Sequence, residues 1–350
     1  MKKILFYGET SRYACHGISM SNDLFLKDLK KEFIIEVYEE VNDLSKYGKA
    51  GFSKILCFFN VLISIFKGIR ISKPDFFYSV LNLSAFGSIK LLLLCLVVTF
   101  FSRHTKIIIH IHRGDYLVKV RSNWLIYFLN FIIFYLADKI ALISEAQVKE
   151  FNNKKIMWVS KYSYICNSVD LMRYKVEKCK TNYYLYLSNY IKEKGIYDLL
   201  DAWACVKLKL LCFGGETPGI SIMQLKEKYV DENITINGSI DGDKKKSIIA
   251  CCHALILPSW NEGAPLVILE AMSLGVPIIA SKVGFISEMV GEEYPFLFEP
   301  KNKKELITRI LEFESLDQPA RKKISNELLD RFESKYSRSN RIKCYKNIFN

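Results

Sequence analysis

The chain has 350 residues, of which 50% are hydrophobic, and a formal net charge of +13. Its length exceeds what one ordinary hydrophobic core serves and suits two domains of usual size. Its 10 cysteines include no C-x-x-C pair and no Cys/His cluster at zinc spacing, which excludes a zinc-finger type of protein.

Strand-like and helix-like segments alternate along the first half of the chain. Apolar runs predict strands at residues 2–7, 33–38, 75–80, 106–112 and 139–144. Helical periodicity predicts helices between them, at residues 18–31, 54–71, 85–101 and 121–137. This alternation is typical of an α/β domain with a parallel, doubly wound sheet. The apolar run at residues 4–7 is short and looks like a first strand rather than a signal peptide, so we expect a cytoplasmic protein.

The basic excess lies in the first half. Residues 1–180 contain 27 lysines and arginines against 15 acidic residues, whereas residues 181–350 contain 23 against 22. This asymmetry indicates an anionic partner, either nucleic acid or an anionic membrane surface. Apolar, aromatic segments in the same half favour the membrane surface, although buried helices of a packed domain have the same composition. These segments, residues 55–71, 91–101 and 124–137, are shorter than the roughly 20 residues that span a bilayer, so we expect no transmembrane helix.

Polar residues follow two strands of the first half. Gly17 lies in the loop after the first strand, and His110, His112 and Arg113 lie where the fourth strand ends. Ligands of doubly wound sheets bind at the carboxyl ends of strands, and strand alternation puts both histidines on one face. We therefore predict that one of the two histidines reaches a ligand site, the alternative being satisfied core or loop histidines; by its position alone, Gly17 fits a simple turn glycine.

The second half continues the same alternation. Strands are predicted at residues 183–187, 208–213, 233–237, 254–258, 276–280 and 296–298. Helices are predicted at residues 196–206, 244–252, 265–275 and 305–314, with a last amphipathic helix at 331–349. The charged residues 171–182 between the two halves suit a linker.

The most informative segment of the second half runs from Glu262 to Pro277. Glu262 lies just before a helix that Pro265 can start, and Glu270 follows about two helical turns later. The first N–H groups of such a helix, around Gly263 to Leu266, suit a phosphate, and the carboxylates can accept hydrogen bonds from sugar hydroxyls. The segment therefore indicates a site for a nucleotide sugar, the alternative being an ordinary helix with two surface acids.

Glu262-x7-Glu270, with Ala271-Met272-x-x-Gly275-x-Pro277 after it, resembles the signature of a known enzyme family. These are the retaining, nucleotide-sugar-dependent glycosyltransferases of family 4, also called group 1, which have the GT-B fold. The resemblance implies two Rossmann-like, doubly wound parallel-sheet domains that face a cleft. It implies an acceptor-side domain at residues 1–175, a donor domain at residues 176–335, and a C-terminal helix, residues 336–350, that crosses back to the first domain.

The resemblance also assigns roles to residues. It implies that Glu262 contacts the donor sugar, that Glu270 contacts the ribose, and that His112 points at the donor sugar. The segment from Ser188 to Gly195 resembles the diphosphate clamp of the family, with Lys194 in place and Asn189 where the family has arginine. The other implied donor-binding residues are Gly263, Ala264, Pro265, Leu266 and Gly215, and the implied residues of the acceptor cleft are Gly17, His110 and Arg113.

We therefore expect a retaining glycosyltransferase that moves a hexose-type sugar from a nucleotide diphosphate sugar to a glycan or lipid-linked acceptor. The expected setting is synthesis of capsule, O-antigen or exopolysaccharide, with peripheral attachment to an anionic membrane. No metal is expected, since Asp241-Gly242-Asp243 lies in a turn without further carboxylates. No cofactor is expected either, and no nucleic acid, which would not explain Glu262 and Glu270. A catalytically inactive partner subunit, a nucleic-acid-binding protein and a sugar-nucleotide epimerase are the alternatives.

Overall fold

The structure, a computed structural model, describes residues 1–12, 17–39, 52–154, 156, 161–169 and 183–350. Its contacts divide the chain into two compact units. Unit 1 consists of Met1–Asn167 with Arg341–Asn350, and unit 2 consists of Ser168–Asn340. The boundary predicted at 175/176 falls outside the described residues, and the one predicted at 335/336 lies a few residues before the division that the structure shows.

Unit 1 is built on a parallel sheet of six strands in the order β2-β1-β3-β4-β5-β6. The strands are β1 (Lys3–Gly8), β2 (Ile34–Glu39), β3 (Phe76–Val80), β4 (Lys106–Ile111), β5 (Lys139–Leu142) and β6 (Tyr162–Tyr164). The first five agree with the sequence prediction. The sixth was not predicted, because three half-buried residues carry no apolar pattern.

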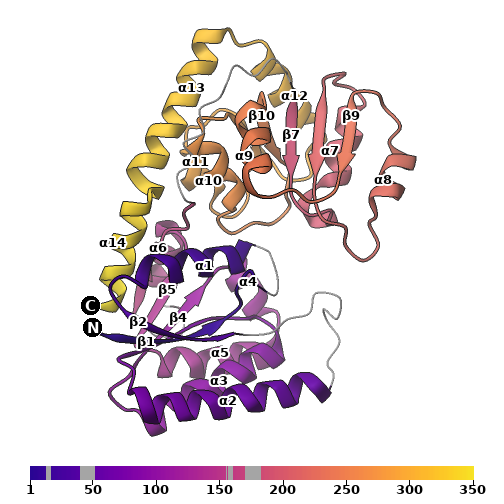
Figure 1. Ribbon diagram of the computed structural model, residues 1–350. Coiled ribbons are helices and arrows are strands. Elements are labelled where there is room, and N and C mark those ends of the chain that lie inside the picture. The colour runs from indigo at the N-terminus through magenta and orange to yellow at the C-terminus, as the bar shows by residue number, and fades with distance from the viewer. Residues whose placement is uncertain (13–16, 40–51, 155, 157–160, 170–182) are drawn as a thin grey trace. The chain divides into compact units, whose positions relative to one another are not determined.

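Helices cover both faces of this sheet (Figure 1). They are α1 (Gly17–Leu29), α2 (Phe52–Ser72), α3 (Ala85–Phe101), α4 (Tyr116–Arg121), α5 (Trp124–Leu136), α6 (Glu145–Asn153) and α14 (Arg338–Phe349). Side chains alternate between the faces of a strand, so each face has its own core. On one face Leu5, Phe77 and Ile109 pack with residues of α2, α3 and α5; on the other, Phe6 and Tyr78 pack with α1 and α14.

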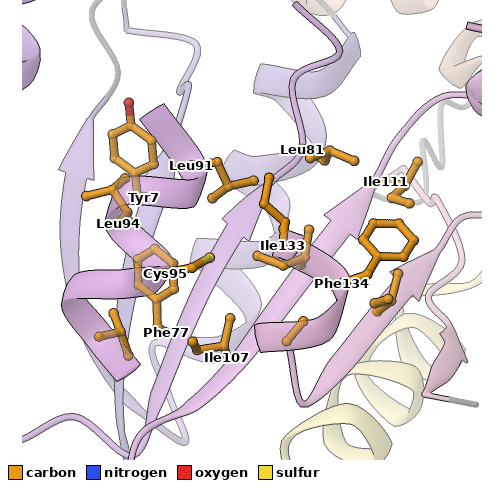
Figure 2. Close-up of a cluster of buried hydrophobic side chains, with 14 of the residues drawn as sticks. Tyr7, Phe77, Leu81, Leu91, Leu94, Cys95, Ile107, Ile111, Ile133 and Phe134 are labelled. Atoms are coloured by element: carbon orange, nitrogen blue, oxygen red, sulfur yellow. The ribbon is translucent and has the colours of Figure 1, made fainter. Parts of the chain in front are cut away.

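Figure 2 shows the first of these two cores. Leu91, Leu94 and Cys95 of α3 lie beside Ile133 and Phe134 of α5, above the strands, and all five side chains are fully or almost fully buried. Close packing of this kind fixes α3 and α5 side by side on the sheet.

Unit 2 holds a second parallel sheet of six strands, in the order β12-β11-β10-β7-β8-β9. The strands are β7 (Tyr184–Leu187), β8 (Leu210–Phe213), β9 (Ile234–Asn237), β10 (Ala254–Leu257), β11 (Ile278–Ser281) and β12 (Leu297–Phe298). All six agree with the sequence prediction to within a few residues at their ends. Because β10 and β7 are neighbours in the middle of the sheet, the loops that follow them lie next to each other.

The helices of unit 2 connect these strands. They are a short 3-10 turn η3 (Lys192–Lys194), α7 (Ile196–Trp203), α8 (Ile222–Lys228), α9 (Gly242–Cys251), α10 (Leu266–Ser273), α11 (Ile286–Val290), α12 (Lys303–Glu314) and α13 (Gln318–Arg331). A π-helical turn, η4 (Phe332–Tyr336), follows α13. The prediction of a single tail helix at residues 331–349 is therefore wrong at its start. Residue 331 is the end of α13, and η4 separates α13 from α14.

The last ten residues return to unit 1, as the GT-B expectation requires. Tyr345, Ile348 and Phe349 of α14 are buried in the core that contains Phe6 and Tyr78. Arg341 is 1% exposed and donates to Asp28 of α1 through Nε at 2.7 Å. A buried ion pair with this geometry fixes the register of the C-terminal helix on α1.

Candidate functional site

Three segments of unit 2, those after β7, β8 and β10, carry the residues that the sequence analysis assigned to the donor. The loop after β11 lies beside them, since the four strands are consecutive neighbours in the order β11-β10-β7-β8. The carboxyl ends of parallel strands meet at one edge of the sheet, so the loops form one cluster. Trp260 N–H, in the loop after β10, donates to the carbonyl of Glu193 at 2.7 Å, which joins two of these loops directly.

Glu262 and Lys194 come together in this cluster. Lys194 Nζ lies 2.8 Å from Glu262 Oε1 and 2.9 Å from Oε2, and the side chain of Glu262 is 7% exposed. The Ser259 hydroxyl donates to Glu262 Oε1 at 2.7 Å. The arrangement holds an ordered, buried carboxylate whose partner lysine remains about one-third exposed and can also reach a ligand.

Glu270 lies inside α10 and is 2% exposed. Its Oε1 accepts from Lys245 Nζ of α9 at 2.6 Å, whereas its Oε2 is buried without a hydrogen-bond partner among the described residues. Burial raises the pKa of the Glu270 carboxyl, and the nearby Lys245 ammonium opposes this rise. A buried oxygen without a donor is costly, so this atom is a ready acceptor for a ligand hydroxyl.

The loop residues around α10 have the places that the motif predicts. α10 begins at Leu266 with Pro265 at its N-cap, and Gly263 and Ala264 lie just before it. The N–H groups of its first turn have no acceptor within the helix, and they carry the positive end of the helix dipole. This end of α10 lies between Glu262 and Glu270 in the chain.

Two glycines let the loops approach this closely. Gly195 has φ of +73°, and a Cβ atom there would lie 2.0 Å from the carbonyl oxygen of Pro258. Gly284, with φ of +57°, lies so close that a Cβ atom would be 2.2 Å from the carbonyl oxygen of Glu262. Glycine alone tolerates both the left-handed backbone and the contact. The segment after β11 therefore braces the Glu262 loop, and Phe285 N–H adds a hydrogen bond to Gly263 O at 3.0 Å.

Asn189 and Gly215 also meet in the cluster. Gly215 N–H donates to Asn189 Oδ1 at 3.2 Å, and Tyr190 N–H donates to Gly215 O at 2.9 Å. Asn189 therefore connects the loops after β7 and β8. An asparagine cannot supply the positive charge of the arginine that the family has at this position.

The two histidines of unit 1 differ in exposure. His110 is 3% exposed, its Nδ1 lies 2.5 Å from the Tyr78 hydroxyl, and burial lowers its pKa well below the usual range. His112 is partly exposed, and its ring centroid lies 3.9 Å from that of His110. His110 is thus buried against the ring of His112, and its place in a ligand cleft stays a prediction.

The other two candidates of unit 1 lie at the surface. Gly17 is the exposed first residue of α1, and a Cβ atom there would meet nothing within 4 Å. Its position therefore sets no steric requirement for glycine. Arg113 forms a two-point ion pair with Asp115, with Nε and one terminal nitrogen each 2.7 Å from a carboxylate oxygen.

Several polar residues of these sites were missed in the sequence. Lys245 binds Glu270, and Ser259 binds Glu262. Lys245 is one of three consecutive lysines, and only the orientation of α9 brings this one to the carboxylate.

In unit 1, the Thr10 hydroxyl donates to Glu39 at 2.7 Å at the ends of β1 and β2. Burial lowers the pKa of Lys90 to about 8, against the effect of nearby Glu9. Hydrophobic pattern carries no signal for such pairs.

One aspartate of the D-x-D segment pairs with a lysine of the same helix. Asp243 is largely exposed and pairs with Lys246 at 3.0 Å. Among the residues that the structure describes, no group of three or more His, Cys, Asp or Glu could hold a metal ion. Metal-independent chemistry stays a prediction.

Comparison with known proteins identifies the second unit. Residues 170–328 match the family model described as glycosyl transferases group 1. Unit 2 is a group 1 glycosyltransferase domain. The matched range contains the Glu262–Pro277 segment on which the resemblance was based, so the predicted likeness to the group 1 glycosyltransferases is confirmed.

Relatives extend this group 1 match. The putative teichuronic acid biosynthesis glycosyltransferase TuaC of Bacillus subtilis is 25% identical over 161 residues, which cover 46% of this chain and 40% of TuaC. The chain spans at most 40% of the length of the first curated relatives that it matches.

Solved structures confirm the GT-B fold over the whole chain. A sucrose-phosphate synthase from Thermosynechococcus elongatus matches with a TM-score of 0.80 at 16% identity, covering 100% of this chain and 99% of that one. Anabaena HepE, solved in complex with UDP-glucose, matches with a TM-score of 0.73 at 16% identity, covering 99% and 98% of the two chains. At these identities the likeness concerns the fold alone.

Proposed function

We propose that the chain is a retaining glycosyltransferase that transfers a hexose-type sugar from a nucleotide diphosphate sugar to a glycan or lipid-linked acceptor. The proposed setting is the synthesis of a cell-surface polysaccharide or a related glycoconjugate. Two relatives support the class of reaction by their names and ligands, TuaC in teichuronic acid synthesis and HepE with UDP-glucose.

The observation that carries the proposal is the pair of buried carboxylates on either side of the α10 N-terminus. Glu262 has a lysine and a hydroxyl as partners, whereas Glu270 keeps one buried oxygen without a donor. An N-terminal helix end between two such acceptors fits a diphosphate flanked by hydroxyl-bearing rings. A structural helix would gain nothing from an unpaired buried oxygen.

Each residue then has a task. Glu270 Oε2 would accept a hydrogen bond from a ribose hydroxyl, and Glu262 would orient the donor sugar. Lys194 would bind the diphosphate and stabilise the negative charge of the leaving group as the glycosidic bond breaks. In unit 1, His112 would contact the reacting sugar. His110 and Tyr78 would hold the imidazole ring of His112 in place.

Retention and metal independence complete the proposal. The described residues offer no second carboxylate pair arranged as a nucleophile and an acid, so we propose that the acceptor attacks the face from which the nucleotide departs. Proton NMR of the glycoside product tests retention, because the signal of the new anomeric proton shows whether the linkage has the same anomeric configuration as the donor sugar. Activity that survives a chelator tests metal independence.

The decisive experiment is a thermal-shift panel with UDP, GDP, ADP and their common sugar derivatives. A ligand that binds only the folded state stabilises it by about 2.7 kcal/mol at a hundredfold excess over its Kd. We expect one nucleotide family to raise the melting temperature of the wild type and to leave Glu270→Gln nearly unshifted. Glu293→Gln, an exposed carboxylate of the same unit, is the matched control and should keep the shift.

A catalytically inactive partner subunit is the second candidate, and Asn189 is the observation that favours it. Asn189 stands where the family's diphosphate clamp has an arginine, and its side-chain oxygen accepts a hydrogen bond from Gly215 N–H. Such a protein would bind the nucleotide sugar but release no nucleotide when offered acceptors. If no nucleotide shifts the wild type at all, both candidates lose their support.

A further inference from the structure

The helix layer formed by α2, α3 and α5 exposes more large hydrophobic side chains than the described part of unit 2. They are Ile55, Leu56, Phe59, Ile63 and Ile71 on α2, Phe86, Ile89, Leu93, Phe100 and Phe101 on α3, and Trp124, Tyr127, Phe128, Phe131 and Tyr135 on α5. Among the described residues of unit 2, the exposed large hydrophobic side chains are only Met223, Val230 and Leu311.

The exposed residues follow the helical repeat. On α5, Trp124, Tyr127, Phe128, Phe131 and Tyr135 are spaced by three or four residues, so they form one stripe along the helix. The opposite stripes of the same helices are buried in the core of unit 1 (Figure 2). A helix that is apolar on all sides is normally surrounded by protein or lipid.

Asn130 shows how far α5 departs from an ordinary surface helix. It is the amide residue of this apolar helix, yet it is 0% exposed and donates to Ser88 Oγ at 3.2 Å and to Ile126 O at 2.8 Å. Meanwhile Trp124 is 79% exposed and Tyr135 is 75% exposed. The polar group points inward and the aromatic groups point outward, which favours an apolar environment outside the helix.

The three stripes form a single surface, because the helices pack side by side. α3 contacts both α5 and α2, and all three cover the same face of the sheet (Figure 1). Contiguous apolar surfaces larger than a few hundred Å² mark sites of interaction with proteins or membranes.

Charge decides which partner fits this helix layer. α2, α3, α4 and α5 contain six lysines and arginines and no aspartate or glutamate. Unit 1 has 26 basic residues against 13 acidic ones, a net charge of +13, whereas unit 2 has 24 of each. A symmetric dimer through this face would bring the basic residues of both copies together. An anionic lipid surface matches both the charge and the apolar stripes.

α2 could be read as a membrane span, since the window Ile55–Ser72 is long and apolar enough to cross a bilayer. The apolar window has 18 residues, close to the predicted segment 55–71, within a helix of 21 residues. However, Phe58, Ile65 and Ile69 of this helix are buried in the core of unit 1. Insertion across a bilayer would remove them from that core, whereas contact through the outer stripe leaves the core intact.

We propose that the outer face of α2, α3 and α5 docks on an anionic lipid bilayer. Its aromatic stripes enter the interface between headgroups and acyl chains, where tryptophan and tyrosine are favoured. Lys67, Arg70, Lys119 and Arg121, all exposed, bind the anionic headgroups around it.

The test is co-sedimentation of the full chain with vesicles of phosphatidylcholine alone or mixed with phosphatidylglycerol. We expect binding to the mixed vesicles that weakens as sodium chloride is raised, because salt screens the charges. No donor or acceptor enters this test, so its result is independent of the proposed transferase activity. Equal and negligible pelleting with both vesicle types would overturn the proposal.

Two triple variants separate the contributions. Trp124→Ser/Phe128→Ser/Tyr135→Ser should abolish binding, and Met223→Ser/Val230→Ser/Leu311→Ser is its matched control in unit 2. Lys67→Gln/Arg70→Gln/Lys119→Gln should lower the partition coefficient by about 100-fold, because each charge near the surface is worth about fivefold. Lys226→Gln/Lys304→Gln/Lys322→Gln is its control and should bind like the wild type.

Other occupants of the face give different results. A protein that sediments as a dimer without lipid, and becomes monomeric in the aromatic variant, would use the face for a second copy and overturn the proposal. Protein that resists extraction by alkaline carbonate would have inserted α2 across the bilayer, which also contradicts docking. Folding of every variant is checked by its melting temperature, since all substituted side chains are exposed.

Discussion

Glu262 and Glu270 belong to one loop cluster but are held differently. Both oxygens of Glu262 accept hydrogen bonds from Lys194. One oxygen of Glu270 accepts from Lys245, and the other is buried without a partner among the described residues. In the folded protein without ligand, the ionised form of Glu270 is therefore less favourable than it is in water, and the pKa of this carboxyl is raised.

This state predicts a pH dependence of stability. A carboxyl whose pKa is higher in the folded state than in the unfolded state binds its proton more tightly when folded. Its contribution to stability is present below the unfolded pKa and is lost as the pH rises through the folded pKa. The difference in free energy of unfolding between wild type and Glu270→Gln should therefore shift in favour of the wild type as the pH falls from about 7 towards about 4.3.

Urea unfolding of both proteins across this pH range measures the effect. The exposed Glu293→Gln variant is the control and should track the wild type at every pH. A difference that shifts in favour of the wild type on raising the pH would mean that Lys245 outweighs the burial of Glu270.

The spacing around a helix start indicated the two carboxylates, and the family resemblance indicated Lys194. Lys245 was missed because its partner Glu270 lies on another helix. Ser259 lies only three residues before its partner Glu262, but a serine in a loop has no sequence pattern that marks it. The sequence also could not separate His110 from His112, since strand alternation puts both on one face and only the packing around Tyr78 buries one of them.

At the scale of the elements, the loop after β11 supports the Glu262 loop through Gly284. In Gly284→Ala, the new Cβ atom would lie 2.2 Å from the Glu262 carbonyl oxygen, so the backbone of one loop must move. We expect a loss of about 1–3 kcal/mol in stability, with weaker nucleotide binding because the Glu262 loop shifts. Thermal melting with and without the nucleotide measures both effects.

Gly242→Ala is the matched control for this variant. Gly242 has the same φ of +57°, but an added Cβ atom would meet nothing within 4 Å. It should show only the smaller backbone strain. Equal losses in the two variants would show that the contact with Glu262 carries no weight.

The C-terminal helix α14 depends on the ion pair between Arg341 and Asp28. Both side chains are almost fully buried, with one Arg341 terminal nitrogen 2.6 Å from Asp28 Oδ2. Arg341→Met would leave the Asp28 charge buried without its partner, which should cost about 3–5 kcal/mol in urea unfolding.

Two further variants test this reading of the ion pair. The double variant Asp28→Leu/Arg341→Met removes both charges and should recover most of the loss. Lys346→Met removes the exposed pair with Glu32 and should change stability by less than about 1 kcal/mol. A large effect of Lys346→Met, or no recovery in the double variant, would contradict the assignment.

Elements with a clear pattern were predicted, and those without one were missed. The strands of both sheets were found from their apolar runs, apart from β6. The polar helix α13 was missed because only Ile324 and Leu328 are buried on it, although Asp317 and Pro319 mark its start. Packing against neighbouring elements, and not local sequence, stabilises such segments.

At the scale of the whole molecule, charge and chemistry separate between the two units. Unit 1 carries the entire net charge of +13, and unit 2 carries the candidate donor site with a net charge of zero. The sequence already showed that the first half of the chain is more basic than the second. Residues 341–350 belong to unit 1 and add three more basic residues to it. The proposed anionic donor would therefore be bound in unit 2 by specific contacts and not by a general positive field.

This separation predicts where a nucleoside diphosphate protects the chain from hydrogen exchange. The nucleotide identified by the thermal-shift panel should slow exchange in the loop 188–195 and in 262–273, because it binds the α10 N-terminus and the residues around it. At a hundredfold excess over its Kd, ligand linkage adds about 2.7 kcal/mol to the opening free energy of amides exposed only when the site unfolds. Exchange across β4, in unit 1, should stay unchanged, and Lys194→Ala should lose most of the protection. Slower exchange confined to residues 106–113 would place the nucleotide on unit 1 and reverse the assignment of the two units.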